Sequence, residues 1–469
     1  MQLLSKRALL ASFISVIICT SCNKNKDLVT PVTSKPATNP VSVTDPNVAK
    51  DSALLEARDL YLWYNQIPST FNARSYDDPD KIMTAIRQYS IEPGFSGPID
   101  RWSFGMKKVD WDNLSSGISA SFSSTTNSAG NYGLGVFFLA QGDLRVKSVE
   151  RASPAGVAGI HRGWRITKIN GSTDITTGNS TFIIDNVFNS TSTNFTFLKP
   201  DGTTVDITLN AAHYADHPVF FDNVYTISSK KIGYMVFNSF LGDTTEISNE
   251  FQRVFSNFAN QNVNDMVIDL RYNGGGYVSV QEKLADYLVA ASANGGLMMK
   301  EQYNDKHSAY NVSTNFRKLG SLNLSRVFFI VSSSTASASE LLINNLKPYM
   351  DVKLLGPSST HGKPVGFFPV PAGDWYVFPV SFKSTNKNGV GNYYNGLPVD
   401  AQVADGLDKD WGDVTETGFA SAIKYITSGS FRTQATVPFT PLPAEVISGN
   451  DKLDQPSFKG SVDSRKGLK

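Results

Sequence analysis

An apolar run followed by a string of small residues sets the strongest limit on how this chain folds. Val327-Phe-Phe-Ile-Val331 predicts a buried strand, and Ser334-Thr-Ala-Ser-Ala-Ser-Glu340 follows it as a turn into a helix. A second apolar stretch ends at Leu354-Leu-Gly356 and leads into His361-Gly-Lys363. Strands that alternate with helices form α/β folds. We therefore expect an α/β core in which these two loops meet.

Ser337 has two interpretations at the start of that helix. With Glu340 three positions on, it fits a capping box, in which the hydroxyl bonds a backbone N–H of the first turn. As a nucleophile it would profit from the small neighbours Ala336 and Ala338, which let a substrate backbone approach. The N–H of Ala338 at the helix N-terminus would then stabilise a developing oxyanion.

Lys363 is the candidate base for Ser337. A lysine acts as a base only when it is neutral, and burial in an apolar cleft lowers its pKa toward the working pH. Ser-Lys pairs are a known variant of the catalytic triad and need no histidine, metal or cofactor. His361 is a rival base, because on an extended strand it shares a face with Lys363.

A glycine-rich loop is the third candidate element. Arg271-Tyr-Asn-Gly-Gly-Gly276 follows the buried strand Met266-Val-Ile-Asp-Leu270. Glycines there allow positive φ angles or a close backbone approach. The loop is either a simple turn or the source of a second oxyanion donor, with Gly275 as the first choice and Gly276 close behind.

These elements together resemble the C-terminal processing peptidases, the tail-specific serine proteases of peptidase family S41. Asp269-Leu-Arg-x-Asn-x-Gly-Gly276, Thr335-Ala-Ser-Ala-Ser-Glu340 and Gly362-Lys363 occur in the order typical of that family, and the similarity spans roughly residues 51 to 430. The resemblance implies a crotonase-like α/β peptidase core with a PDZ domain and a small N-terminal helical region, a multidomain α/β protein without a cofactor.

The resemblance also assigns roles to individual residues. It makes Ser337 the nucleophile, with Ser339 as the alternative, and Lys363 the base. It implies that Glu340 orients the lysine. The chain departs from the family at Pro357-Ser-Ser-Thr-His361, which is one residue longer than the commoner form and predicts a bulge that displaces Lys363.

Short strands and turns between residues 115 and 212 resemble a bacterial PDZ domain. The similarity rests on Tyr132-Gly-Leu-Gly-Val136, Ser153-Pro-Ala-Gly-Val-Ala-Gly159 and a hairpin turned at Asp201-Gly202. It implies that one backbone loop holds the terminal carboxylate of a peptide and that the following strand accepts the peptide as an added strand. That loop comprises Gly133, Leu134, Gly135 and Val136. The alternative is that Leu134 and Val136 are only core residues.

The N-terminus predicts a targeting segment. Lys6 and Arg7 precede an apolar run over residues 8–18, which is too short for a stable membrane-spanning helix. The run ends in a sequence that resembles a bacterial lipobox and places lipidation at Cys22, with a plain secretion signal as the alternative. Cys19 would leave with the signal. The mature body then has no free thiol, which excludes thiol catalysis and cysteine metal sites.

Composition divides the rest of the chain and limits its partners. The net charge of +1 gives no reason to expect nucleic-acid binding. We expect a lipoprotein signal peptide at 1–22, a flexible linker at 23–50, an N-terminal helical region at 51–114, a PDZ-like domain at 115–212, an S41-like peptidase core at 213–430 and a poorly ordered tail at 431–469.

The expected function is a lipid-anchored serine endopeptidase of the bacterial cell envelope, facing the periplasm or held at the outer membrane. It would take proteins or peptides with free apolar C-termini through its PDZ-like domain and cut them by a Ser-Lys mechanism. The alternative is a catalytically silent peptide-binding lipoprotein that keeps the fold. A third hypothesis is an envelope-associated lipoprotein whose peptidase works only within a complex.

Overall fold

A six-stranded sheet organises the largest part of the computed structural model, which describes residues 45–118, 130–431, 440–454 and 458–463. The β7–β8 pair is antiparallel and the other neighbouring pairs are parallel. Parallel strands end at one edge of the sheet, so the loops after β9, β13 and β14 lie close together. In spatial order the strands are β19 (Ala401–Gln402), β14 (Asp351–Gly356), β13 (Arg326–Ile330), β9 (Asp265–Asp269), β8 (Lys230–Phe237) and β7 (Val219–Ile227).

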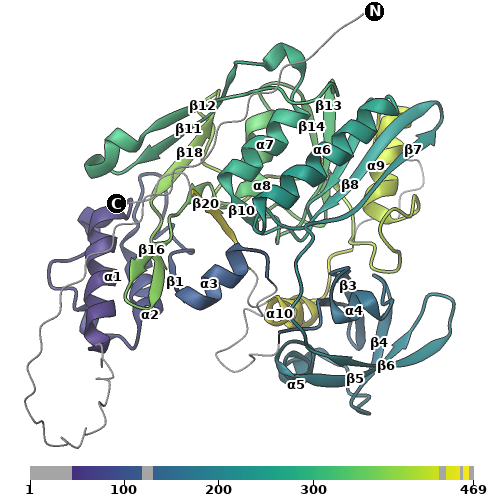
Figure 1. The fold of residues 1–469 in the computed structure, drawn as a ribbon, viewed down its shortest axis with the longest axis horizontal. Coiled ribbons are helices and arrows are strands. Elements are labelled where there is room, and N and C mark those ends of the chain that lie inside the picture. Colours follow the sequence, from purple (N-terminus) through teal and green to yellow (C-terminus); the bar gives the residue numbers. More distant parts are fainter. Residues whose placement is uncertain (1–44, 119–129, 432–439, 455–457, 464–469) are drawn as a thin grey trace, which may run out of the picture. The chain divides into compact units, whose positions relative to one another are not determined.

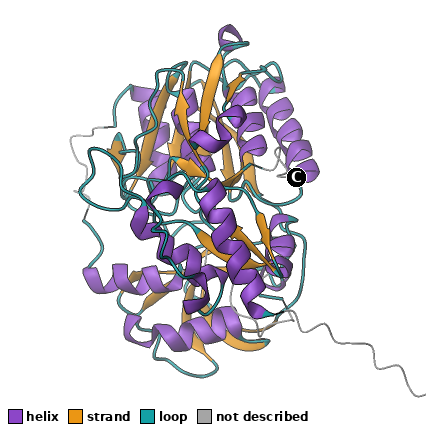
Figure 2. Cartoon of the chain, turned by 90° about the vertical axis from the view of Figure 1, so that its left-hand side faces the viewer, coloured by secondary structure: helices purple, strands orange, loops and turns teal. Residues whose placement is uncertain are grey.

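Helices cover both faces of this sheet, which makes the fold mixed α/β. Helices α6 (Thr244–Asn260), α7 (Val278–Leu288) and α8 (Ala338–Leu346) share one hydrophobic cluster with alternate residues of the strands. Helix α9 (Thr417–Ser428) shares a second hydrophobic cluster with the strand residues that point to the opposite face of the sheet. Met235 therefore belongs to the first cluster and its neighbour Tyr234 to the second. Figure 2 shows strands in orange beside helices in purple.

The N-terminal residues join the core directly. Strand β1 (Phe104–Lys107) follows helices α1 (Pro46–Leu60) and α2 (Pro79–Ile86) and leads into α3 (Lys108–Ser115). It pairs with β17 (Trp375–Phe378), which pairs in turn with β16 (Val370–Ala372). Strands β12 (Val312–Asn315), β11 (Leu297–Tyr303), β18 (Phe382–Asn386) and β15 (Val365–Gly366) form a further sheet.

The predicted linker boundary at residue 50 is wrong, because α1 begins at Pro46. The Asp45 carboxylate accepts a hydrogen bond from the Asn47 N–H at 2.9 Å, and proline in the first helical turn is favoured.

Residues 130–215 hold a separate five-stranded sheet with its own hydrophobic core. Its strands are β2 (Leu134–Ala140), β3 (Asp143–Val149), β4 (Arg165–Ile169), β5 (Ser192–Leu198) and β6 (Thr204–Asn210), in that spatial order, with the short helices α4 (Pro154–Val157) and α5 (Ser180–Ile184). The β5–β6 hairpin turns at the predicted Asp201-Gly202. Strand β2 is an edge strand of this sheet.

The prediction of a poorly ordered tail is wrong for two described stretches. Helix α10 (Ala444–Leu453) packs against β2 and buries Val446 and Leu453 in the core of the five-stranded sheet. Strand β20 (Gly460–Val462) pairs in parallel with β10 (Gly275–Tyr277), which contains two of the candidate glycines. Figure 1 shows both stretches in yellow, α10 near α5 and β20 beside β10. The apolar residues of the two stretches show no common helical or strand period in the sequence, because each stretch packs against a different distant element.

The predicted signal peptide, its lipidation site Cys22 and most of the predicted linker lie outside the described residues. Among the helices that the structure does describe, none combines the length and the apolar character needed to cross a membrane.

Candidate active site

Ser337 sits on a strained turn between β13 and α8. Its backbone angles are φ 57° and ψ −105°, whereas N-cap residues normally adopt an extended conformation. A non-glycine residue held in such a region costs about 1–3 kcal/mol, and this strain is typical of exposed nucleophiles on strand-to-helix turns. The capping box with Glu340 is present, but capping alone does not require this backbone. The Oγ also lies 2.7 Å from the Oγ of Ser461.

Glu340 holds the two predicted loops together. One of its carboxylate oxygens accepts hydrogen bonds from the backbone N–H groups of Ser337 and Lys363, each at 2.8 Å. The other accepts from the Gly362 N–H at 2.6 Å and from the Thr360 hydroxyl. Burial raises the pKa of Glu340 even though these bonds favour its ionised form. Glu340 therefore positions Lys363 through its backbone.

The lengthened loop before Lys363 is pinned rather than loose. Its Thr360 hydroxyl accepts from the Leu397 N–H at 2.7 Å and donates to Glu340, and the His361 N–H donates to the Thr335 carbonyl at 2.9 Å. Thr360 was not predicted as a site residue, because a threonine in a polar loop carries no sequence signal of its partner. These bonds fix the backbone on the N-terminal side of Lys363.

Lys363 is buried, with 1% of its surface exposed, and its ammonium nitrogen contacts the chain's own C-terminal stretch. Nζ donates to the Lys459 carbonyl at 2.6 Å and lies 3.5 Å from the centroid of the Phe367 ring. Burial holds the pKa of Lys363 well below its usual value, against the opposing charges of Asp100 and Glu340. A lysine with this environment is suited to act as a base.

His361 is poorly placed to be the rival base. The Trp102 indole N–H donates to its Nε2 at 3.2 Å, and the ring also hydrogen-bonds to the backbone of Ser333. Burial and then the charges of Lys459, Lys363 and others lower the pKa of His361 to about 4. Its Nε2 lone pair is thus directed at Trp102 rather than at Ser337.

The glycine loop meets the serine turn through Asn273. The Asn273 carbonyl accepts from the Ala336 N–H at 3.0 Å and from the Ser339 hydroxyl at 3.1 Å. Ser339, the alternative nucleophile, is therefore engaged with the backbone. The Asn273 side chain accepts from the Gly275 N–H at 2.9 Å. The N–H of Gly275, the first choice as an oxyanion donor, is thus bonded to the Asn273 side chain, which favours the second choice, Gly276.

A buried ionic cluster holds Arg271, the first residue of the glycine-rich loop. The guanidinium of Arg271, 3% exposed, pairs with Asp269 at 2.7 Å, Asp405 at 2.7 Å and Glu416 at 2.8 Å. Asp405 also pairs with Arg162, which precedes β4 of the five-stranded sheet. The sequence pattern contained Arg271 and Asp269 but did not point to Asp405 and Glu416, which lie 134 and 145 positions from Arg271.

We expect Arg271→Met to lower the free energy of unfolding by about 3–5 kcal/mol, because it leaves buried carboxylates without a partner. Arg253→Met is the matched control. Arg253 pairs with Asp222 and Glu250 but is 48% exposed, so its loss should cost about 1 kcal/mol or less. Urea unfolding of both variants measures the difference. Equal losses would contradict the structural role of the cluster.

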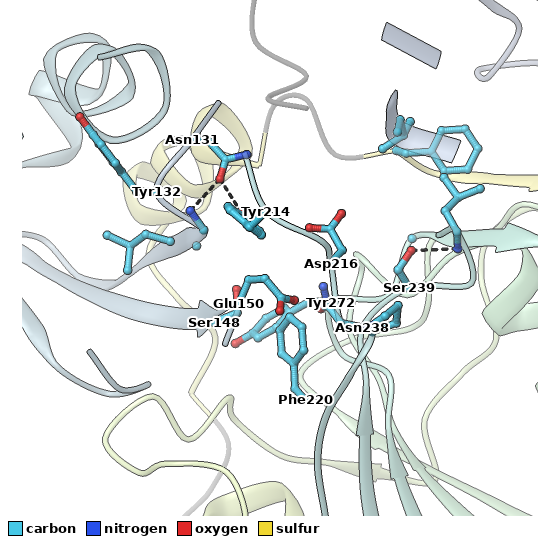
Figure 3. A pocket seen from close by; sticks show the side chains of 18 of the residues that line it. Asn131, Tyr132, Ser148, Glu150, Tyr214, Asp216, Phe220, Asn238, Ser239 and Tyr272 are labelled. Atoms are coloured by element: carbon cyan, nitrogen blue, oxygen red, sulfur yellow. Dashed lines mark hydrogen bonds between the residues drawn. The ribbon is translucent and has the colours of Figure 1, made fainter. Parts of the chain in front are cut away.

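The predicted carboxylate loop lines a pocket that also reaches the glycine loop. Gly133, Leu134 and Gly135 line it together with Gly274 and Gly275. Val136 is fully buried and does not line it. The Gly133 N–H donates to the Asn131 side chain at 2.7 Å. Figure 3 shows Asn131, Glu150 and Asp216 around this pocket.

The edge of β2 is covered at the position where an added peptide strand was expected. The Asn450 side chain of α10 accepts from the Phe138 N–H at 2.7 Å and donates to the Phe138 carbonyl at 3.0 Å. These are the backbone groups that strand addition requires. In this structure the expected peptide position at Phe138 is therefore taken by the chain itself.

The comparisons with known proteins bear on the core. Residues 231–395 match the model of peptidase family S41. That segment is therefore similar to the peptidase domains of family S41. It contains the glycine loop, Ser337, Glu340 and Lys363.

Solved structures share the fold more widely. A Bacteroides fragilis NCTC 9343 protein described as a putative S41 protease superposes with a TM-score of 0.64 at 23% identity, over 83% of this chain and 99% of that one. The photosystem II D1 C-terminal processing protease gives a TM-score of 0.46 at 19% identity, over 77% of this chain and 94% of that one. No curated protein matches this chain.

Among the described residues, no group of three or more His, Cys, Asp or Glu side chains is arranged to hold a metal ion. Glu340 brings the backbones of Ser337 and Lys363 together, and Asn273 joins the serine turn to the glycine loop.

Proposed function

We propose that this protein is a serine peptidase in which Ser337 and Lys363 form the catalytic pair. The observation that carries the proposal is the strained turn at Ser337, at the N-terminus of α8. Glu340 bonds the backbone of Ser337 and also that of Lys363, a buried lysine whose pKa is lowered. A helix cap has no use for either the positive φ or the buried lysine. Both side chains also contact one short stretch, residues 459–461, from the same cleft.

The proposed reaction follows from these positions. Neutral Lys363 removes the proton of the Ser337 hydroxyl, and Oγ attacks the substrate carbonyl. The N–H groups of Ala338 and Gly276 stabilise the oxyanion. Lys363 then protonates the leaving amine, and water hydrolyses the acyl-enzyme to regenerate Ser337.

The five-stranded sheet is proposed to act as a PDZ-like receptor for substrate C-termini. Its Gly133–Gly135 loop lines the same pocket as Gly274 and Gly275 of the glycine loop, which supports transfer of a bound tail toward Ser337. Lipidation at Cys22 would hold the enzyme at the bacterial envelope. Substrates would then be proteins or peptides with free, apolar C-termini.

Peptide capture should weaken as the pH rises. Burial is the main cause that raises the pKa of Glu150 to about 8 and that of Asp216 to about 7, and both residues line the pocket. Their ionisation places negative charge beside a bound carboxylate. Since each of the two repulsive contacts costs on the order of 1 kcal/mol, we expect affinity for a free-ended peptide to fall roughly 30-fold between about pH 6 and about pH 9.

Fluorescence anisotropy with a labelled peptide measures this dependence. Glu150→Gln should flatten the upper part of the curve, and a peptide with an amidated C-terminus should show little change. Tighter binding at high pH would contradict the assignment of the pocket.

The proposed activity is tested by digestion of an unfolded protein and of paired peptides with free and amidated C-termini. Cleavage that requires Ser337 and Lys363 and favours the free-ended peptide would establish the function. Binding of the free-ended peptide without any cleavage would refute it.

A second candidate, a catalytically silent peptide-binding lipoprotein, is favoured by one observation. Ser337 is fully buried, and its hydroxyl contacts Ser461 of the chain's own C-terminal stretch. Labelling of Ser337 by a fluorophosphonate separates the two, because only an activated serine reacts.

A further inference from the structure

We propose that the protein cleaves its own C-terminal segment at the Gly460–Ser461 peptide bond. This inference rests on the proposed function and names an intramolecular substrate for it. The C-terminal segment is defined here as residues 440–454 and 458–463. It enters both places where a substrate would bind, with α10 on the edge of β2 and β20 on the catalytic glycine loop.

Strand β20 lies along the glycine loop as an extended peptide. Gly460 pairs with Gly275 and Ser461 with Gly276, and the Gly460 N–H donates to the Gly274 carbonyl at 2.9 Å. On the other side the Phe367 N–H donates to the Ser461 carbonyl at 2.9 Å. Ser461 and Val462 are 3% and 1% exposed. Backbone bonds on both sides hold a peptide in register irrespective of its side chains.

The catalytic groups bracket one peptide bond of this strand. The Ser461 hydroxyl lies 2.7 Å from Ser337 Oγ, and the Lys459 carbonyl accepts from Lys363 Nζ at 2.6 Å. The Gly460 carbonyl oxygen lies against Gly275, because a Cβ built there would be 2.4 Å from that oxygen and 3.0 Å from the Ala338 nitrogen. The carbonyl oxygen and the Ala338 nitrogen thus both lie close to the same point beside Gly275, and the nucleophile lies beside the next residue.

Two further residues, Asp454 and Asn450, hold the segment in place. Asp454 at the end of α10 pairs with Lys147 of β3 at 3.1 Å and accepts from the Ser334 hydroxyl at 3.2 Å. Asn450 occupies both backbone groups of Phe138. An intramolecular peptide anchored by these residues has an effective concentration that a free substrate does not reach.

The reaction balances without any further reagent than water. Ser337 Oγ attacks the Gly460 carbonyl carbon while its proton passes to neutral Lys363. The bond between the Gly460 carbon and the Ser461 nitrogen breaks, and Lys363 returns the proton to the new amine. Water then hydrolyses the ester between Ser337 and Gly460, leaving a carboxylate on Gly460 and a restored hydroxyl. The released peptide is Ser461 to Lys469 of the printed sequence.

Mass spectrometry of the full chain after incubation tests the inference. Wild type should end at Gly460 and release the Ser461–Lys469 peptide, at a rate that does not depend on protein concentration. Ser337→Ala should retain the peptide, with a cleavage rate lower by at least about 10³-fold. A rate that increases with protein concentration would overturn the intramolecular assignment.

A glycine pair provides the matched control. A Cβ at Gly274 would lie 1.9 Å from the Phe458 carbonyl oxygen, so Gly274→Ala should displace the segment and prevent its release. Gly178→Ala meets only the Thr176 hydroxyl at 3.7 Å and should be cleaved like wild type.

The outcome also separates this inference from the function on which it rests. A wild-type chain that stays intact while it digests an unfolded protein, or reacts with a fluorophosphonate at Ser337, would overturn self-cleavage and leave the peptidase assignment standing. Absence of self-cleavage, digestion and labelling together would overturn both.

Discussion

Ser337→Ala should abolish cleavage, lowering kcat/KM for an unfolded protein by about 10⁴-fold or more, as removal of a catalytic serine does elsewhere. The backbone of Ser337 has φ 57°, which alanine tolerates no worse than serine. Glu340 accepts a hydrogen bond from the backbone N–H of Ser337, and alanine keeps that N–H. The variant should therefore fold normally. Loss of activity then reports the hydroxyl itself.

Ser339→Ala is the control that separates the two candidate nucleophiles. Ser339 donates its hydroxyl to the Asn273 carbonyl at 3.1 Å and lies in the same turn, equally buried. We expect it to retain activity within about tenfold, since a single neutral hydrogen bond contributes about 1 kcal/mol. The kinetic assay with both variants decides the matter, and a larger loss in Ser339→Ala would reverse the assignment.

Lys363→Arg should lower kcat by about 10³-fold, although it preserves the positive charge. A guanidinium does not deprotonate at accessible pH, so it has no lone pair with which to take the Ser337 proton. The same requirement sets the pH profile of the wild type. Because burial lowers the pKa of Lys363, the neutral form appears well below the usual range of lysine, and kcat/KM should rise with pH through that pKa and then level off.

His361→Asn is the control for this prediction. Its pKa of about 4 and its bond to Trp102 leave it outside proton transfer at neutral pH, so the variant should keep the basic limb of the profile. A profile that loses this limb in His361→Asn, or a wild type with no such limb, would contradict the role of Lys363.

The stability of the lysine variant provides an independent measurement. The unfolded chain carries a protonated lysine at neutral pH, whereas the folded chain holds it with a lowered pKa, so the unfolded state binds more protons and stability rises with pH in that interval. Lys363→Met removes this cost. It should have a higher Tm than wild type at pH 7, and the gain should shrink as the pH approaches the unfolded pKa of lysine, about 10.4.

The sequence alone determined the local elements and the identity of the chemical groups. The apolar runs 266–270 and 327–331 correspond to β9 and β13, and the helix expected after the serine turn is α8. These predictions succeed because a strand or helix covered by a core repeats its apolar positions at a short period. The serine and lysine of the proposed pair were found because each follows such a strand.

Only the tertiary structure decided how these groups are used. The Asn273 side chain takes the Gly275 N–H, Glu340 joins the two loops, and Trp102 engages His361, and each partner is set by a contact that no local pattern encodes. The lowered pKa of Lys363 likewise depends on burial by residues far along the chain. The C-terminal segment shows most clearly what the sequence could not predict. Its residues Leu453 and Val462 are buried in two different hydrophobic clusters, so its apolar residues do not repeat at the period of a single helix or strand.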